Sequence, residues 1–302
     1  MSQATSAELH TDPTQFPGVD VYAVAGNPIS HSKSPVIHKR FAEQSNQKMH
    51  YGRLQPELGE FKPAVQTFFA AGGKGMNITV PFKLDAQAFA DVLTPRAQLA
   101  GAVNTLRIQD GKIFGDNTDG AGLVRDLLAQ GIQIQGSRIL LLGAGGASRG
   151  VLGPLLEQSP AELIIANRSN VKAEDLVQLF SDLAHSLQVV LTAVTLGELE
   201  DVSKTASPFD LIINATAAGL SNESPISDAA ASNVFTPQSF AYDMVYGKVT
   251  ALMQQALHRG ARVSDGLGML VEQAADAFLI WRGAQLADAI DSRAVLAELR
   301  NS

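Results

Sequence analysis

The chain has 302 residues, 45% of them hydrophobic, and its formal net charge at pH 7 is −7. This length predicts one large or two ordinary domains, and the negative charge argues against nucleic acid or an anionic membrane as the main partner. The sequence contains no cysteine, which excludes disulfides and thiolate chemistry. None of its six histidines has another histidine four residues away, so we predict no metal site.

The N-terminal segment does not resemble a targeting signal. Its first fifteen residues are polar and lack the basic-then-apolar pattern of a secretory signal. No apolar run in the chain approaches the roughly 18 residues of a membrane-spanning helix. We therefore expect a cytoplasmic protein and interpret residues 1–18 as a flexible tail.

Three serines precede the first predicted helix. A weakly alternating strand over residues 19–25 ends at a Gly-Asn-Pro turn, and the segment SHSKSP, residues 30–35, then leads into a helix over 36–44. Serines at alternate positions before a helix can offer hydroxyl and N–H groups to an anion. An ordinary cluster of helix-capping residues is the alternative, and this segment alone leaves both open.

A lysine follows the third predicted strand in an unusual position. After a strand over 49–54 and a helix over 58–71, the segment GMNITVPFK predicts a strand that ends at Val80 and a helix that begins with Pro81. Lys83 would then lie in the first turn of that helix, where the dipole disfavours a positive charge. That field favours release of a proton, which suits a lysine that transfers protons. A solvated surface lysine is the alternative.

Two aspartates follow a predicted hairpin. Residues 103–108 and 112–114 form its strands around Asp110-Gly111, and the segment GDNTDGAG then precedes a helix over 123–129. Four side chains of this segment are typical helix caps, and capping alone would account for them: Asp116, Asn117, Thr118 and Asp119.

From residue 137 onward, strands alternate with helices. This alternation predicts a doubly wound parallel sheet. The expected strands cover residues 139–142, 163–166, 188–194, 211–214, 241–245 and 262–264, and the expected helices cover 148–157, 171–186, 250–258, 269–282 and 294–300.

A glycine-rich turn follows the first of these strands. The sequence RILLLGAGGASRG, residues 138–150, has the strand–turn–helix layout of a dinucleotide phosphate site. Gly143 allows the tight turn, and Gly145 lets backbone N–H groups approach a pyrophosphate at the helix N-terminus. Ser148 stands where the fingerprint has its third glycine, so a tight turn without a ligand is the alternative.

The residues after the second strand of this sheet indicate which dinucleotide would bind. In NAD sites an acidic residue about twenty positions beyond the glycines takes the ribose 2′-hydroxyl. Here the strand ends in Asn167, Arg168 and Ser169, and Lys172 follows. Two cations would attract a 2′-phosphate, so the sequence predicts NADP rather than NAD. Two solvated surface charges are the alternative.

Eight segments, in this order along the chain, resemble the shikimate dehydrogenase family: NPISHSKSP, NITVPFK, AVNTL, GDNTDGAG, GAGGASRG, NRSNVKA, YDMVY and DGLGMLVEQAA. The resemblance implies reduction of 3-dehydroshikimate to shikimate with NADPH, on the route to chorismate and the aromatic amino acids. It also implies an α/β fold of two domains. An N-terminal catalytic domain, residues 19–118, would be completed by the C-terminal helices of 267–302, and residues 119–266 would form a Rossmann-type doubly wound NADP-binding domain.

The same resemblance implies a role for each matching residue. Lys83 and Asp119 are similar to the catalytic pair, in which the lysine protonates the oxygen of the carbonyl group that receives the hydride. The substrate carboxylate would be held by Ser32, Ser34 and Tyr246, and the ring hydroxyls by Thr79, Lys83, Asn104, Asp119 and Gln273. NADP would be bound through Gly143, Ala144, Gly145, Gly146 and Ala147 at the pyrophosphate, through Asn167, Arg168, Ser169 and Lys172 at the adenosine ribose phosphate, and through Thr216, Met244, Gly266 and Met269 beside the nicotinamide.

Two other functions are compatible with this fold. A quinate/shikimate dehydrogenase of broader specificity tends to use NAD, against which Arg168 and Lys172 argue. A non-catalytic NADP-binding regulatory protein would be expected to lack the lysine or the aspartate of the pair, and both are present. The segment after Tyr246 looks shortened relative to the family, which leaves its contacts open. We expect a monomer or homodimer that acts on a small molecule.

Overall fold

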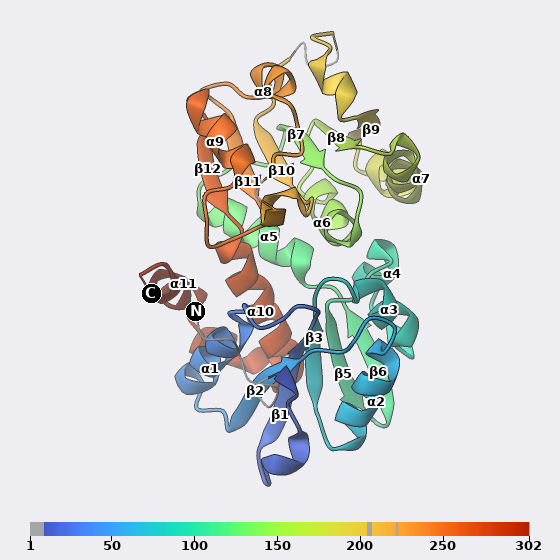
Figure 1. Ribbon diagram of the computed structural model, residues 1–302, viewed down its shortest axis with the longest axis vertical. Coiled ribbons are helices and arrows are strands. Elements are labelled where there is room, and N and C mark those ends of the chain that lie inside the picture. The colour runs from blue at the N-terminus through green and yellow to red at the C-terminus, as the bar shows by residue number, and fades with distance from the viewer. Residues whose placement is uncertain (1–8, 204–206, 222, 302) are drawn as a thin grey trace. The chain divides into compact units, whose positions relative to one another are not determined.

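Two α/β units make up the chain (Figure 1). This computed structural model describes residues 9–203, 207–221 and 223–301. Contacts divide the chain into a first unit, Met1–Gly122 with Leu270–Ser302, and a second unit, Leu123–Met269. Each unit is built around its own six-stranded sheet. The predicted α/β fold class is confirmed.

The sheet of the first unit is mixed. Its strands follow the order β2-β1-β3-β5-β6-β4, in which β1 pairs in parallel with β2 and β3, whereas β5 is antiparallel to β3 and β6. The strands are β1 Asp20–Ala25, β2 Met49–Leu54, β3 Gly75–Ile78, β4 Val92–Leu93, β5 Thr105–Gln109 and β6 Lys112–Asp116. Ala25 pairs with both Leu54 and Ile78, so the three parallel strands end side by side.

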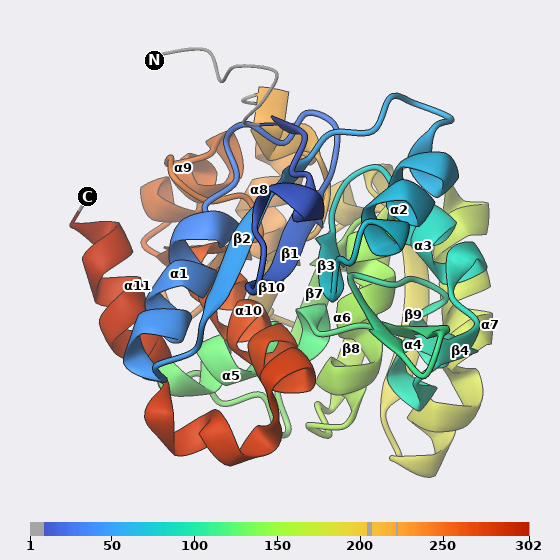
Figure 2. The same ribbon diagram turned by 90° about the horizontal axis from the view of Figure 1, so that it is seen from below.

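Helices cover both faces of this sheet. Alternate residues of β1 pack in opposite directions, because Val21 and Ala23 share a core with α2, whereas Tyr22 and Val24 pack with Trp281 of α10. Figure 2 shows α1 and α2 on opposite sides of β1. The helices of this unit are η2 Pro13–Gln15, α1 Ser34–Gln44, α2 Phe61–Ala70, α3 Lys83–Phe89, α4 Pro95–Ala100, η5 Ala284–Ala289 and α11 Ser292–Arg300, and α10 Leu267–Arg282 belongs largely to it.

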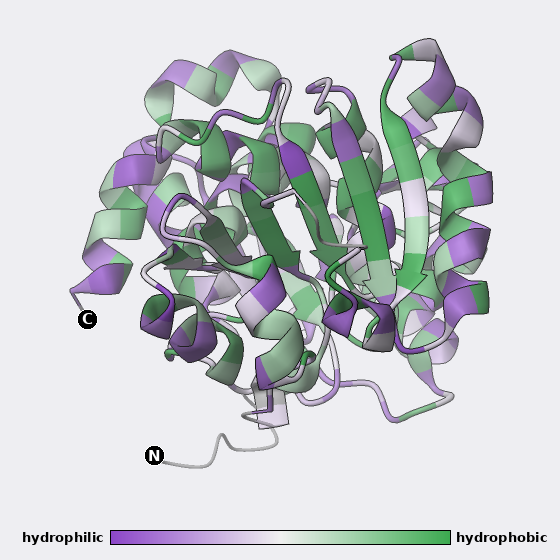
Figure 3. Ribbon diagram, turned by 90° about the horizontal axis from the view of Figure 1, so that it is seen from above, coloured by the Kyte–Doolittle hydropathy of each residue, from purple (hydrophilic) through white to green (hydrophobic). Residues whose placement is uncertain are grey.

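The sheet of the second unit is wholly parallel, with the strand order β12-β11-β10-β7-β8-β9. The order reverses beside β7, which creates the switch point at which ligands bind in such sheets. Its strands are strongly hydrophobic (Figure 3), as expected for a sheet covered on both faces. The strands are β7 Arg138–Leu142, β8 Glu162–Asn167, β9 Val190–Thr195, β10 Leu211–Asn214, β11 Phe240–Asp243 and β12 Arg262–Asp265. The predicted doubly wound sheet is confirmed.

The helices of the second unit follow its strands in alternation. They are α6 Gly146–Leu156, α7 Asn170–Ser186, η3 Gly197–Glu200, η4 Ala218–Ser221, α8 Asp228–Val234 and α9 Ala251–His258, and α5 Asp119–Ala129 enters the unit from the first. In the part of the chain that the structure describes, every helix is too short or too polar to cross a bilayer.

The turn before α3 differs from the prediction. β3 ends at Ile78 rather than Val80, and α3 begins at Lys83 rather than Pro81. The N–H of Phe82 donates to the carbonyl of Thr79 at 3.0 Å, which closes a turn with Pro81 at its third position. The predicted helix start at Pro81 is wrong, because Pro81 belongs to this turn, but Lys83 does open the helix.

Part of the predicted N-terminal tail lies against the first unit. His10 forms an antiparallel bridge with Leu54, and the N–H of Thr11 donates to the carbonyl of Arg53 at 2.9 Å. Residues 1–8 lie outside the described residues. The segment from His10 to Thr11 thus extends the hydrogen bonding of the edge strand β2.

Candidate active site

Lys83 and Asp119 form an ion pair in the first unit. Each is the first residue of its helix, α3 and α5, and the Lys83 Nζ lies 2.5 Å from the Asp119 Oδ2. Their side chains are only 16% and 8% exposed. The structure therefore brings together the two residues predicted as the catalytic pair, in a site that is largely closed to solvent within this unit.

The second carboxylate oxygen of Asp119 is fixed from the opposite side. The Asn104 Nδ2 donates to the Asp119 Oδ1 at 2.8 Å, and the N–H of Asp119 donates to the Asn117 Oδ1 at 3.1 Å. One oxygen thus accepts from an amide and the other from an ammonium group, and hydrogen bonds to a charged group are the stronger kind. The carboxylate cannot rotate without breaking both.

Asn104 also lies next to Gln273 of α10. The Asn104 Nδ2 and the Thr118 Oγ1 lie 3.4 and 3.3 Å from the Gln273 Oε1 and donate to it. The N–H of Thr118 donates to the Asn104 Oδ1 at 2.9 Å. Buried amides and hydroxyls in contact with an ion pair can supply donors and acceptors to a polyhydroxylated ring. The sequence predicts Thr118 only as a helix cap. Its position next to Asp119, a predicted site residue, is the one feature of the sequence that indicates a place in the site.

The two predicted carboxylate ligands lie at the start of α1. Ser32 and Ser34 are 8% and 4% exposed, and the N–H of Ser34 donates to the Ser32 Oγ at 3.3 Å. The N-cap residue is Lys33, which makes no side-chain capping bond. Ser32 therefore satisfies one backbone N–H, as the capping interpretation requires, and the Ser34 hydroxyl has no capping role in α1.

Thr79 lies at the ends of β1 and β3. Its N–H donates to the carbonyl of Ala25 at 2.9 Å, and a Cβ at Gly26 would lie 2.5 Å from its methyl group. The other predicted substrate ligand, Tyr246, follows β11 in the second unit. Its role toward the substrate stays a prediction.

Asp116 is part of a structural ion-pair cluster. It accepts from Arg96 and from the Thr94 Oγ1, and the Arg96 Nη1 also donates to Asp276 of α10 at 2.8 Å. Burial raises the pKa of the Asp116 carboxyl, but the hydrogen bonds from Arg96 and Thr94 lower it by more. The interpretation of Asp116 as a cap of α5 is wrong, because this carboxylate instead joins β6 to Thr94 and Arg96 at the start of α4, and Arg96 makes the contact with α10.

In the second unit, the glycine-rich turn connects β7 to α6. Gly143 has a φ of +107°, and a Cβ there would lie 3.0 Å from the Thr216 Cγ2. Gly145 is the N-cap of α6 and makes no side-chain capping bond, and a Cβ there would meet open space. The first N–H groups of α6 are thus not capped by a side chain, which suits an anion such as a pyrophosphate.

Ser148 explains the missing third glycine. Its side chain is fully buried, and its Oγ donates to the carbonyl of Gly143 at 2.8 Å. A small hydroxyl side chain therefore fits between α6 and the turn and ties the two together. Ala144, Gly146 and Ala147 are half-buried in the same turn.

Residues predicted beside the nicotinamide lie at the carboxyl ends of three neighbouring strands. Thr216 follows β10, and its N–H and hydroxyl both donate to the Asn214 Oδ1. Met244 follows β11, and its carbonyl lies 2.2 Å from where a Cβ at Gly266 would be, so only glycine fits there. The N–H of Met269 donates to the Tyr242 hydroxyl at 3.2 Å. This edge of the sheet is where Rossmann folds bind their cofactor.

The end of β8 carries the two predicted phosphate ligands. Arg168 and Lys172 are exposed, and among the described residues neither forms an ion pair. The Asn167 Nδ2 donates to the carbonyl of Ser169 at 3.0 Å, which shapes the turn into α7. A cationic turn without an acidic residue fits the extra phosphate of NADP.

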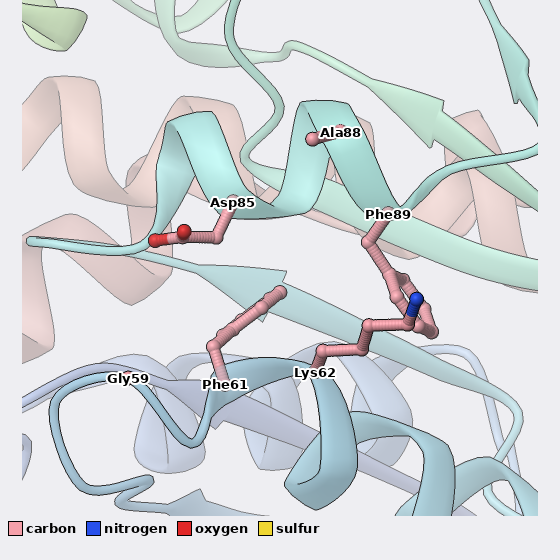
Figure 4. A pocket seen from close by; sticks show the side chains of 6 residues that line it. All are labelled: Gly59, Phe61, Lys62, Asp85, Ala88 and Phe89. Carbon is pink, nitrogen blue, oxygen red and sulfur yellow. The ribbon is translucent and has the colours of Figure 1, made fainter.

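One pocket lies apart from these residues. It has a volume of about 270 Å³, lies between α2 and α3, and is lined by Gly59, Phe61, Lys62, Asp85, Ala88 and Phe89 (Figure 4). It contains none of the predicted site residues. Within the described ranges, no group of three His, Asp or Glu side chains could hold a metal ion.

Transfer of a hydride to a carbonyl group requires a bound dinucleotide and a proton donor. The second unit has a turn and cations that suit the dinucleotide, and the first has a lysine that suits the donor. These features define the class of dinucleotide-dependent oxidoreductases.

Comparison with known proteins identifies the family. Residues 24–106 match the family model of the shikimate dehydrogenase substrate binding domain, and residues 126–236 match that of shikimate / quinate 5-dehydrogenase. Shikimate dehydrogenase (NADP(+)) of Vibrio atlanticus is 50% identical over 288 residues, which are 94% of this chain and 98% of that protein. The chain belongs to the shikimate dehydrogenase family, and the predicted resemblance is confirmed.

Solved structures agree with this assignment. The Ael1 enzyme from Pseudomonas putida is 44% identical with a TM-score of 0.80, over 93% of this chain and 98% of that one. Shikimate 5-dehydrogenase from Thermus thermophilus, solved in complex with NADP(H) and shikimate, is 31% identical with a TM-score of 0.79, over 94% of this chain and 99% of that one.

Proposed function

We propose that this chain catalyses the reversible NADPH-dependent reduction of 3-dehydroshikimate to shikimate, a step toward chorismate and the aromatic amino acids. The observation that carries the proposal is the largely buried Lys83–Asp119 pair, held by Asn104, in a chain of this family. Its relatives named as NADP(+)-dependent shikimate dehydrogenases match along nearly their whole length.

The acid–base step is assigned to the ion pair. Bound NADPH supplies the hydride to the carbonyl carbon of the substrate. The Lys83 ammonium donates its proton to the carbonyl oxygen, and in the oxidation of shikimate the neutral amine accepts that proton. Asp119 holds the ammonium group within 2.5 Å and keeps it positioned for the transfer. General acid–base catalysis of this kind contributes typically about 10²–10⁴-fold in rate.

Substrate binding is assigned to the residues predicted for it from the sequence. Ser32 and Ser34, with Tyr246, would hold the carboxylate, while Thr79, Asn104 and Gln273 would hold the ring hydroxyls. Of these side chains, Asn104 and Gln273 belong to the network around Asp119, and they are 2% and 7% exposed. We assign residues 19–118 and 267–302 to the substrate domain and 119–266 to the NADP domain, in a cytoplasmic monomer or homodimer.

NADP fits the turn and the cations of the second unit. Residues 143–147 would hold the pyrophosphate at the N-terminus of α6, and Asn167, Arg168, Ser169 and Lys172 would hold the adenosine ribose phosphate. Thr216, Met244, Gly266 and Met269 would line the nicotinamide. Two observations support this assignment: Gly145 makes no side-chain capping bond, and the exposed cations after β8 pair with no carboxylate in the described ranges.

The test is turnover by the purified protein. With shikimate and NADP⁺, we expect the absorbance of reduced nicotinamide to rise, and Lys83→Ala protein serves as the matched blank. Quinate and NAD⁺, each replacing one reactant, test for the broader quinate/shikimate dehydrogenase. Folded wild-type protein that binds NADP but oxidises neither shikimate nor quinate would instead support a non-catalytic NADP-binding role.

A further inference from the structure

Arg53 contacts the serine segment, residues 30–35, which leads into α1. It is on β2, two residues after Tyr51, and side chains two apart on a strand point to the same face. Tyr51 stacks on His38 of α1 with ring centroids 4.1 Å apart, so this face of β2 is turned toward α1. The Arg53 Nη2 donates to the carbonyl of Ser32 at 2.8 Å. A guanidinium group thus touches the backbone of the predicted carboxylate-binding segment.

The charge of Arg53 has no counter-ion in the described part of the chain. No carboxylate oxygen of a described residue lies within 4.0 Å of its guanidinium nitrogens. Its Nε is buried and donates to nothing. A partly buried cation with an unused N–H is costly unless an anion or another acceptor compensates it. The serine segment next to it is where the substrate carboxylate is expected to bind.

Tyr51 links Arg53 to the second serine. Burial raises the pKa of the Tyr51 hydroxyl well above its ordinary value, whereas a hydrogen bond donated by Ser34 and the positive charge of Arg53 act in the opposite direction. The Tyr51 hydroxyl itself donates to the Asn77 Oδ1 at 2.7 Å. Arg53 of β2 is therefore hydrogen-bonded to Ser32, and Tyr51 of the same strand interacts with Ser34.

We propose that Arg53 is a positioning residue for the substrate carboxylate: it fixes the Ser32 carbonyl and supplies the positive charge that balances the carboxylate at Ser32 and Ser34. The inference rests on the proposed function. Serine hydroxyls and helix N–H groups carry only partial charges, so a full charge behind them adds electrostatic attraction in a site of low effective dielectric. The backbone of Arg53 is held in place for this by Thr11, whose N–H and hydroxyl both donate to its carbonyl at 2.9 Å.

The test separates the charge from a merely structural role. Two substrates are compared, shikimate and its methyl ester, in which a neutral ester replaces the carboxylate. For Arg53→Gln we expect the KM for shikimate to rise about 10- to 100-fold, which is about 1.4–2.8 kcal/mol, with kcat and the KM for NADP⁺ kept. The kcat/KM for the ester should change far less, because the ester has no charge to balance.

Two further variants keep the experiment decisive. Arg53→Met removes the charge while keeping much of the apolar stem, and it should behave like Arg53→Gln. Arg53→Lys restores the charge without the fork and should bring the KM for shikimate to within about threefold of wild type. Arg107→Gln is the matched control, because Arg107 is a strand arginine of the same unit that lies over the Phe114 ring. Arg107→Gln should leave the KM for shikimate and the kcat/KM for the ester unchanged.

The outcomes distinguish this proposal from the proposed function. Wild-type protein that does not oxidise shikimate would refute the function. If the wild type is active but Arg53→Gln or Arg53→Met loses the same factor with acid and ester, Arg53 has only a structural role and the inference is overturned. An unchanged KM for shikimate in the folded variants overturns it as well.

Discussion

His38 lies in the core of the first unit and should make that unit less stable in mild acid. Its ring is fully buried, stacks on Tyr51, and lies 5.2 Å from the ring of Trp281. Its Nε2 contacts the Asn77 Oδ1 at 3.1 Å, while its Nδ1 is buried without a partner. Burial lowers the pKa of His38 from 6.5 to about 3, although the hydrogen bond with Asn77 acts in the opposite direction.

The size of the effect follows from the difference in pKa between the folded and unfolded chains. Below pH 6.5 the unfolded chain binds a proton at His38, and the folded chain does not until the pH reaches about 3. The free energy of unfolding therefore falls as the pH is lowered through this interval. Each pH unit in this interval is worth about 1.4 kcal/mol. Titration of His38 alone should therefore lower the free energy of unfolding by about 2 kcal/mol between roughly pH 7 and pH 5.

The assay is denaturant-induced unfolding at both pH values, followed by fluorescence of Trp281, which is the single tryptophan of the chain and belongs to this unit. His38→Gln should be less stable than wild type at pH 7, but its loss on acidification should be smaller by about 2 kcal/mol. His31→Gln, which removes an exposed histidine of the same unit, should keep the wild-type dependence on pH. Equal losses for wild type and His38→Gln would refute the reasoning.

The remaining predictions concern catalysis and binding. Lys83→Ala should lower kcat by about 10²–10⁴-fold with a smaller effect on the KM for shikimate. The double variant with Asp119→Asn should lose far less kcat than the product of the two single losses. A folded Lys83→Ala enzyme with near-normal kcat would exclude Lys83 as the proton donor. Charge-assisted hydrogen bonds contribute about 1.5–3 kcal/mol each. The double variant Arg168→Ala/Lys172→Ala should therefore bind NADP about 10²–10⁴-fold more weakly and bind NAD with nearly unchanged affinity. Equal losses of affinity for both dinucleotides would contradict this prediction. Ser34→Ala should raise the KM for shikimate and spare the KM for NADP⁺, and an unchanged shikimate KM would exclude Ser34 as a ligand.

The alternating sheet of the second unit could be predicted because its signals are local. Each signal spans only a few consecutive residues: the apolar run of β7, the glycines that follow it, and the caps at the helix ends. By contrast, the short helix α8 begins at a Ser227 cap and has only seven residues, which is less than two clear periods of a hydrophobic pattern. The helix α4, however, has a local start signal, because Thr94 caps it and Pro95 occupies its first position.

The candidate site was predictable as a set of motifs but not as a network. Nothing local in the sequence indicates that Asn104 bridges Asp119 and Gln273, because 169 residues separate Asn104 from Gln273. Asn77 has only a weak local signal as a polar residue in the strand Gly75–Ile78, and the structure shows that all four residues of this strand are buried. The prediction of Asp116 as a cap is wrong because its partner Arg96 comes from α4, a helix that the hydrophobic pattern does not indicate.

The division of the chain has a consequence for the order in which the units can be completed during synthesis. The first unit needs α10, whose Trp281 Nε1 donates to the carbonyl of Leu106 at 3.0 Å and whose Arg282 pairs with Asp20, and it needs α11, whose Glu298 pairs with Arg40 of α1. The second unit is one uninterrupted stretch. A ribosome therefore delivers every residue of the second unit before the last helices of the first exist. The β1–β6 sheet emerges before the second unit, yet Tyr22 and Val24 have no covering α10 until that whole unit has been synthesised.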